Sequence, residues 1–200
     1  MDFIPDDMFN VPYGWAALIH GPMFSGKTGE LVRVLNRAEE YARLRVQAFK
    51  PVIDDRYGKG VISTHKGVSF SATEVQNTQD IIDRLNPSTQ VIGISEIQFL
   101  DDKIVEFCKT QRLNHKMIIM EGLVLDYKQA PFLFKNSNRS VLELLGQVYS
   151  VQRTAICGCG KQPAIYTMRT VASKEQVLVG GTDSYVAACP GCHKIPEDTK

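Results

Sequence analysis

The stretch Gly21-Pro-Met-Phe-Ser-Gly-Lys-Thr28 has the G-x-x-x-x-G-K-T spacing of a phosphate-binding loop. It follows the apolar run Trp15-Ala-Ala-Leu-Ile19, which suits a buried strand, and precedes residues 28–44, whose apolar positions recur at helical spacing. In that setting backbone N–H groups can surround a polyphosphate, Lys27 can neutralise its charge and Thr28 can ligate Mg²⁺. The stretch therefore predicts a site for a nucleoside triphosphate. A turn that merely connects a strand to a helix is the alternative.

Length and composition narrow the class of protein. The chain has 200 residues, which suits one domain with a small appendage, and its 44% hydrophobic and 22% charged residues are ordinary for a soluble globular protein. The net charge of +1 gives no electrostatic reason to expect nucleic acid or a membrane surface as partner. Without a signal peptide or an apolar run of ~20 residues, we expect a cytoplasmic protein, in the host cytoplasm if the gene is viral. There the five cysteines suit metal ligands or free thiols better than disulfides.

Strand-like and helix-like segments alternate up to about residue 150. The further strands are expected at 46–52, 90–94 and 117–120, and a helix at 101–112. Such alternation favours an α/β domain with a mostly parallel sheet covered by helices, and with ligands at the carboxyl ends of the strands. After residue 150, Gly, Cys and β-branched residues replace helical patterning. We therefore expect a nucleotide-binding domain over residues 1–150 and a small metal-binding domain over residues 151–200.

The predicted strand at 90–94 runs into the polar segment Ser95-Glu-Ile-Gln-Phe99. In P-loop proteins an acidic residue in this place orients Mg²⁺ or the nucleophile, and Glu96 could accept the proton of an attacking hydroxyl group. A solvated glutamate at a strand end is the alternative. Phe99 favours a site, because an apolar ring on a polar loop could stack on a base.

Two cysteine pairs, Cys157-Gly-Cys159 and Cys189-Pro-Gly-Cys192, stand about thirty residues apart in the sequence. Two close pairs at a distance indicate a tetrahedral structural zinc site, with His193 as a reserve ligand. Unpaired buried thiols are the alternative, and the C-x-C pair is tighter than the usual C-x-x-C. Cys108 lies on the predicted helix at 101–112 and is expected to be a core thiol.

Further motifs follow the phosphate loop in a fixed order. They are Asp54-Asp-Arg-Tyr57, Ser63-Thr-His65, Ser95 to Phe99, Gly122-Leu123 with Asp126-Tyr127 and Pro131-Phe132, Val179-Gly-Gly-Thr-Asp-Ser-Tyr185, and Cys189 to His193. As a set, over roughly residues 14–193, they resemble the type II thymidine kinases. The resemblance implies a P-loop (RecA-like) α/β domain followed by a zinc-stapled lasso domain that closes over the nucleoside. It also implies transfer of the γ-phosphate of ATP to the 5′-hydroxyl of thymidine or deoxyuridine in pyrimidine salvage. Members are commonly homotetramers inhibited by thymidine triphosphate.

The resemblance also implies roles for individual residues. Those expected at the donor phosphates are Gly21, Pro22, Met23, Phe24, Ser25, Gly26, Lys27 and Thr28. Glu96 is implied as the base, Arg56 as a phosphate ligand beside the acceptor, and Asp54 with Thr28 as the Mg²⁺ site. Those implied around the nucleoside are Met23, Phe99, Leu123, Tyr127, Phe132, Thr167, Gln176, Leu178, Val179, Gly180 and Tyr185. Zinc is expected at Cys157, Cys159, Cys189 and Cys192.

Three positions depart from the family's usual pattern: Ser95 and Val124 each stand where many members have Asp, and the first cysteine pair is C-x-C. Ser95 matters most, because a hydroxyl group is a weaker acceptor for magnesium-bound water than a carboxylate. Glu121, at the end of the neighbouring predicted strand, could supply the missing charge; otherwise it points into solvent or pairs with a Lys or Arg. Three functions stay open: a thymidine or deoxyuridine kinase, a kinase for another nucleoside, and a nucleotide-binding paralogue without phosphoryl transfer.

Overall fold

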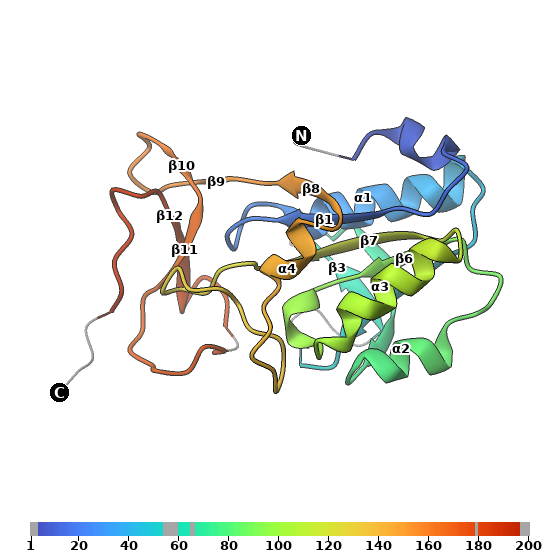
Figure 1. The fold of residues 1–200 in the computed structure, drawn as a ribbon. Helices are drawn as coiled ribbons and strands as arrows, with labels where there is room; N and C mark the ends of the chain where they lie inside the picture. The colour runs from blue at the N-terminus through green and yellow to red at the C-terminus, as the bar shows by residue number, and fades with distance from the viewer. Residues whose placement is uncertain (1–3, 54–59, 65–66, 179, 197–200) are drawn as a thin grey trace.

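The computed structural model describes residues 4–53, 60–64, 67–178 and 180–196. Its larger part is built on a six-stranded sheet in which every neighbouring pair of strands is parallel, in the order β5-β2-β6-β7-β1-β8 (Figure 1). The strands are β1 (Ala16–His20), β2 (Val46–Pro51), β5 (Thr73–Val75), β6 (Val91–Ile94), β7 (Met117–Gly122) and β8 (Tyr149–Gln152). The predicted α/β fold with a mostly parallel sheet is confirmed.

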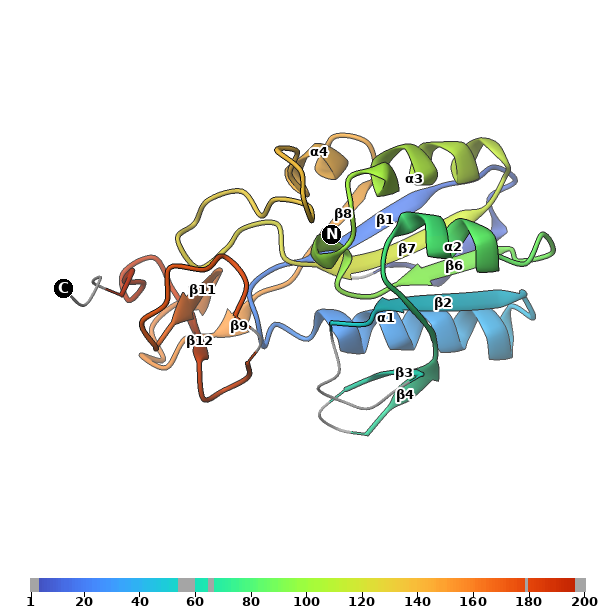
Figure 2. The same ribbon diagram turned by 90° about the horizontal axis from the view of Figure 1, so that it is seen from below.

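Helices cover both faces of this sheet. The helical segments are η1 (Asp6–Asn10), α1 (Lys27–Asn36), η2 (Arg37–Tyr41), α2 (Thr78–Arg84), η3 (Ile97–Phe99), α3 (Lys103–Leu113) and α4 (Leu142–Leu145). Helix α1 lies on one face together with the hairpin β3–β4 (Val61–Ser63 and Ser69–Ser71), and α2 and α3 lie on the other (Figure 2). No helix within the described ranges is long and apolar enough to cross a membrane.

The alternating side chains of each strand explain this layered arrangement. Leu18 and Ile118 pack into the core on the side of α3, whereas Ile19 and Ile119 pack into the core on the side of α1. All five residues of β1 are buried, as expected for a parallel strand covered on both faces. Each such aliphatic side chain contributes about 1.5–3 kcal/mol by its burial. Apolar packing therefore holds the sheet from both faces and fixes the edge at which the carboxyl ends of its strands lie.

The observed elements follow the expected ones closely at the centre of the sheet. The strands expected at 46–52, 90–94 and 117–120 and the helix expected at 101–112 are confirmed to within two residues. The helix expected over 28–44 is shorter, because α1 ends at Asn36 and the chain continues as a π-helical turn, η2. There the backbone N–H of Ala42 donates to the carbonyl of Arg37, five residues back.

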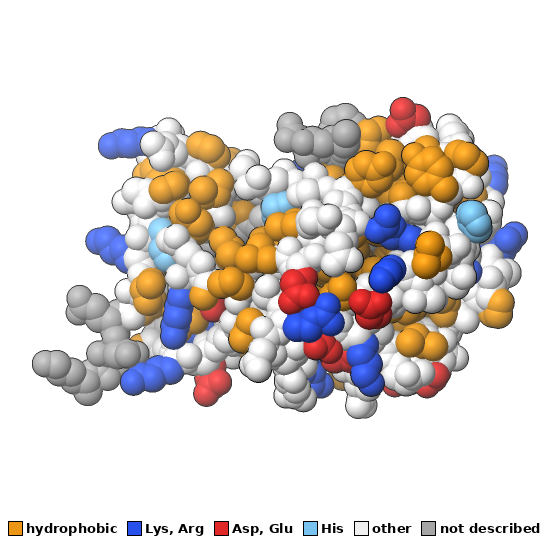
Figure 3. Space-filling model, in the orientation of Figure 1, with side chains coloured by type: hydrophobic (Ala, Val, Ile, Leu, Met, Phe, Trp, Pro, Cys, Tyr) orange, Lys and Arg blue, Asp and Glu red, His pale blue; other side chains and the backbone are white. Residues whose placement is uncertain are grey.

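The chain after β8 forms a smaller lobe of short antiparallel pairs. It contains β9 (Ala155–Ile156) with β10 (Pro163–Ala164), and β11 (Tyr166–Arg169) with β12 (Tyr185–Ala188). The lobe lies beside the end of β1 that leads into the phosphate loop (Figure 1). On the face shown in Figure 3, charged side chains of both signs are interspersed, and hydrophobic side chains continue from this lobe toward the larger one. Strand β8 belongs to the main sheet and crosses the boundary expected between residues 150 and 151.

Candidate active site

The phosphate loop connects β1 to α1, and two of its positions require glycine. Gly26 has φ 79° at the N-terminus of α1, a left-handed conformation that side chains disfavour. At Gly21, which has φ 143°, a Cβ would lie 2.1 Å from the carbonyl oxygen of Arg153. Lys27 is 7% exposed, and its Nζ donates to the carbonyl of Pro22 at 2.8 Å, inside the curve of the loop. The loop thus has the preformed shape that holds phosphates.

Next to the loop, β6 and β7 bring Ser95 and Glu121 side by side. The two strands pair in parallel with Ile94 opposite Met120, so the residues that follow are also neighbours. Ser95 Oγ donates to Glu121 Oε1 at 2.6 Å, and the backbone N–H of Glu96 and the hydroxyl of Thr28 approach the same oxygen at 3.2 and 3.4 Å. Glu121 is 0% exposed, so the solvent-facing alternative is wrong. Burial, together with the nearby Glu96 carboxylate, raises the pKa of Glu121 to about 7.

Glu96 is held by its own backbone and by Gln98. It has φ 48° and ψ 50°, a left-handed conformation that turns the chain out of β6. Gln98 Nε2 donates to Glu96 Oε2 at 2.5 Å, while Gln98 Oε1 accepts the backbone N–H of Leu123 at 3.0 Å. Because an N–H group occupies the oxygen of the amide, its nitrogen must face the carboxylate. The Gln98 side chain is 1% exposed, so a buried amide group fixes the orientation of the Glu96 carboxylate.

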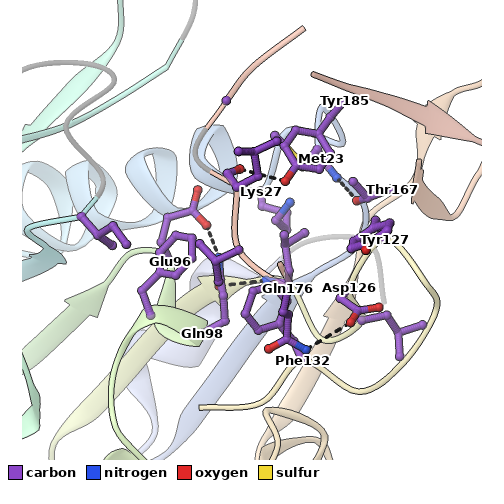
Figure 4. Close-up of a pocket in the computed structure, with 17 residues that line it drawn as sticks. Met23, Lys27, Glu96, Gln98, Asp126, Tyr127, Phe132, Thr167, Gln176 and Tyr185 are labelled. Atoms are coloured by element: carbon purple, nitrogen blue, oxygen red, sulfur yellow. Dashed lines mark hydrogen bonds between the residues drawn. The ribbon is translucent and has the colours of Figure 1, made fainter. Parts of the chain in front are cut away.

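A mostly apolar pocket opens between the larger lobe and the smaller one (Figure 4). Ten of the eleven residues expected around the nucleoside line it: Met23, Phe99, Leu123, Tyr127, Phe132, Thr167, Gln176, Leu178, Gly180 and Tyr185. Three residues outside the described ranges, Asp54, Arg56 and Val179, also carry predicted roles. The pocket is further lined by Lys27, Ile53, Glu96, Gln98, Leu125, Asp126 and Val177.

Hydrogen bonds tie the smaller lobe to the larger one around this pocket. The backbone N–H of Met23, in the phosphate loop, donates to Thr167 Oγ1 on β11 at 2.9 Å (Figure 4). Gln176 Nε2 donates to Asp126 Oδ2 at 3.1 Å, across the same opening. The rings of Phe99 and Phe132 meet edge to face with centroids 6.2 Å apart. The walls of the pocket are thus fixed relative to the phosphate loop.

Residues 170–184 connect β11 to β12, and this segment contributes Gln176, Val177, Leu178 and Gly180 to the lining of the pocket. Arg169, the last residue of β11, holds the segment in place. Its guanidinium group donates to the carbonyls of Ser173 (3.1 Å), Glu175 (2.6 Å) and Gln176 (3.0 Å) and to Tyr185 Oη (2.9 Å). The same group lies 3.7 Å from the centroid of the Tyr127 ring, a cation–π contact. Arg169 is 2% exposed. We call residues 170–184 the lasso segment.

A second, more polar cleft lies on the other side of Lys27 and Glu96, between α1 and the β3–β4 hairpin. Its basic residues are Lys27, Arg33, Arg37, Lys50 and Arg153. Met23, Lys27 and Glu96 line both the cleft and the apolar pocket, so the two spaces meet at these side chains. Lys50 and Arg153 were not predicted from the sequence. The position of Lys50 near the end of a predicted strand could have indicated it, whereas Arg153 follows β8, which was not predicted.

Four cysteine thiols lie close together in the smaller lobe. The Sγ atoms of Cys157, Cys159, Cys189 and Cys192 lie within 4.8 Å of one another, and those of Cys159 and Cys189 are 3.8 Å apart. A Zn–S distance of about 2.3 Å places tetrahedral sulfur atoms about 3.8 Å apart, so this four-thiol cluster could hold a zinc ion. Hydrogen bonds from the backbone lower the pKa of Cys157 to about 6, which favours the thiolate. His193 instead contacts Gln129 and the carbonyl of Tyr127.

The phosphate loop, the carboxylate beside it and the apolar pocket next to both define a P-loop nucleotide-binding enzyme of the phosphotransferase class. Residues 14–193 match the family described as thymidine kinase. A thymidine kinase of Bdellovibrio bacteriovorus is 37% identical over 176 residues, which cover 88% of this chain and 83% of that protein. The chain belongs to the thymidine kinase family, and the predicted resemblance is confirmed.

Proposed function

We propose that this protein transfers the γ-phosphate of ATP to the 5′-hydroxyl of thymidine or deoxyuridine, giving the nucleoside monophosphate and ADP. The observation that carries the proposal is that Lys27 and Glu96 line both the polar cleft and the apolar pocket, so the two spaces meet at these side chains. A phosphate donor in the cleft and a nucleoside in the pocket would meet there. Membership of the thymidine kinase family supports thymidine as the acceptor.

The proposed reaction forms one bond and breaks one. The 5′-hydroxyl oxygen attacks the γ-phosphorus, its proton passes to the Glu96 carboxylate, and the bond between the γ-phosphorus and the bridging oxygen of ADP breaks. Lys27 stabilises charge on the transferring group, and Arg56, outside the described residues, is proposed to contact the same phosphate. Gln98 donates to Oε2 of Glu96 and so orients the carboxylate that would receive the proton. Positioning and charge stabilisation of this kind account for most of the catalysis in phosphoryl transfer.

The pocket suits a pyrimidine held mainly by shape. Apolar and aromatic walls would stack on the base, and Thr167 is proposed to lie beside the thymine methyl group. Backbone groups of the lasso segment near Gln176 are proposed to hydrogen-bond the edge of the base. The lasso segment would also keep water away from the γ-phosphate. We propose that the chain as far as β8 forms the nucleotide-binding domain and that the residues after β8 form the lasso domain, so that the boundary expected at residues 150–151 moves to the end of this strand.

Two metals fit this arrangement. Mg²⁺ neutralises the charge of the donor phosphates when bound, and Thr28 with a nearby carboxylate, Glu121 or Asp54, would hold it. The buried hydroxyl of Ser25 has no hydrogen-bond partner among the described residues, which fits a loop shaped for phosphate oxygens. The four-thiol cluster would hold a structural zinc ion, because four protein ligands leave no open position for chemistry. We further propose a cytoplasmic homotetramer, inhibited by thymidine triphosphate, that acts in nucleotide salvage.

ATP-dependent phosphorylation measured across the natural nucleosides tests the proposal. Thymidine or deoxyuridine should be the preferred acceptor, and Glu96→Gln should lower turnover by the ~10²–10⁴ typical of a lost general base, while ATP still binds. Glu106→Gln, an exposed acid on α3, is the matched control. Preference for another nucleoside would correct the substrate. Absence of transfer to any nucleoside would favour the nucleotide-binding paralogue.

A further inference from the structure

The two oxygen atoms of the buried Glu121 carboxyl group have unequal surroundings. Its Oε1 accepts hydrogen bonds, but Oε2 is fully buried and has no hydrogen-bond partner among the described residues. Burial and the carboxylate of Glu96 nearby both disfavour the charged form of this carboxyl group, and the positive charge of Lys27 offsets these effects only in part. A buried acid kept under these conditions points to something cationic that it receives from outside.

The surroundings of Glu121 indicate which cation. Thr28, at the first turn of α1, directs its hydroxyl to Glu121 Oε1 at 3.4 Å. P-loop enzymes hold Mg²⁺ with the Ser or Thr that follows the loop lysine, together with an acidic residue from another strand of the sheet. Ser95, which follows β6 at the position where the family pattern has Asp, is uncharged. The carboxylate beside Thr28 comes instead from β7, the strand that pairs with β1.

The geometry of the two strands makes this exchange possible. Ser95 and Glu121 are lateral neighbours, because Ile94 pairs with Met120. The short Ser95 side chain leaves room for the longer one, and its hydroxyl donates to Glu121 Oε1 at 2.6 Å, which orients the carboxylate. Both residues are buried, so neither side chain has much freedom.

We propose that Glu121 is the carboxylate that holds the Mg²⁺ of the donor nucleotide together with Thr28, and that Ser95 positions it. The metal-holding acid of this chain thus stands on β7, one strand away from Ser95, where the family pattern places an Asp. This inference rests on the nucleotide-binding part of the proposed function and not on the identity of the acceptor nucleoside.

Binding of Mn²⁺ to the complex of the protein with ADP, followed by electron paramagnetic resonance, tests the inference without turnover. Glu121→Gln should weaken Mn²⁺ binding by about 10–100-fold, the range for lost partners of a metal site, while ADP binds without metal as before. Adding Ser95→Asp to Glu121→Gln should restore most of the affinity. Ser95→Asp alone should not improve binding, because it crowds a further carboxylate against Glu96 and Glu121.

The controls separate a metal role from a structural one. Glu106→Gln should leave Mn²⁺ affinity unchanged, and circular dichroism should show that every variant is folded. If Glu121→Gln is folded and binds Mn²⁺ within twofold of the parent, the inference is wrong and Asp54 becomes the candidate. If Glu121→Gln does not fold, the protein that carries both Glu121→Gln and Ser95→Asp is measured instead. Tight Mn²⁺ binding by this protein supports a carboxylate at the metal in this place. Weak Mn²⁺ binding by the folded protein, or its failure to fold, overturns the inference. A preparation that binds Mn²⁺–ADP normally but phosphorylates no nucleoside would refute the proposed kinase function alone.

Discussion

Replacing Arg169 by methionine should loosen the lasso segment while the sheet remains intact. Methionine keeps a comparable apolar stem but removes the four hydrogen bonds to Tyr185 Oη and to the carbonyls of Ser173, Glu175 and Gln176. It also removes the cation from the Tyr127 ring. All of these contacts lie within or against the lasso segment, so the loss should be local.

The size of the effect follows from these contacts. A hydrogen bond from a charged donor contributes about 1.5–3 kcal/mol, but the carbonyls released here lie on partly exposed residues and can bind water instead, and a buried cation is removed. We therefore expect a net loss of about 2–3 kcal/mol, near the upper end of common single-residue effects. Since 1.4 kcal/mol is a factor of ten, the closed lasso segment should become less populated by roughly 30–150-fold.

Hydrogen exchange followed by mass spectrometry gives the direct assay. Exchange in residues 170–184 should accelerate by about that factor, with β1 and β7 unchanged, and the KM for thymidine should rise more than kcat falls. Arg139→Met is the matched control, since Arg139 makes a surface ion pair with Glu143. Equal acceleration in β1 and β7 would show global destabilisation, and lasso exchange within threefold of the parent would refute the pinning role of Arg169.

Three further outcomes follow from the structure. Protein purified without chelator should contain about one zinc per chain, and absence of zinc would contradict the four-thiol site. After chelation, thiol titration should find four reactive cysteines. Cys108 should react only after the protein is denatured, because burial raises its pKa to about 12. Gly122→Ala should lower both turnover and melting temperature, because the new Cβ would lie 2.4 Å from Gln98 Oε1; a variant with parental turnover would show that the contact relaxes freely. Gln98→Leu should reduce kcat more than thymidine affinity, since it removes the donor that holds Glu96, and an unchanged kcat would exclude this positioning role.

The centre of the fold could be predicted from the sequence because its strands are continuous apolar runs. Strands β1, β6 and β7 are buried throughout and bounded by turns, a pattern that local composition shows. Strand β8 could not be predicted, because only one of its four residues is buried and its strand conformation depends on pairing with β1. The π-helical turn after α1 was also missed, since apolar spacing alone cannot tell it from continued α-helix.

The residues of the site were predicted to different degrees. The phosphate loop and the cysteine pairs carry their own spacing signals, whereas the lining of the apolar pocket was predicted only from the resemblance of the whole set of motifs. The proximity of Glu121 to Ser95 was predicted from the expected edge of the sheet, and the pairing of β6 with β7 confirms it. Arg169 was not recognised, because its hydrogen-bond partners are mainly backbone carbonyls, which no side-chain pattern in the sequence reveals. Gln98 lies in the motif from Ser95 to Phe99, but its bonds to Glu96 and to the backbone of Leu123 became visible only in the fold.

The four-thiol cluster has a consequence for the connectivity of the chain. Cys159 and Cys189 lie 30 positions apart, and between them run β10, β11, the lasso segment and β12. A zinc ion at the cluster would close this stretch into a ring, and closing a loop of that length restricts the unfolded chain by roughly 3–4 kcal/mol on the scale known for disulfides. A single proteolytic cut within residues 170–184 would then leave two fragments still joined through the metal. To separate them, the metal would have to be removed and β11 would have to unpair from β12, so the C-terminal part of the enzyme would stay assembled after a backbone cut as long as it keeps its zinc.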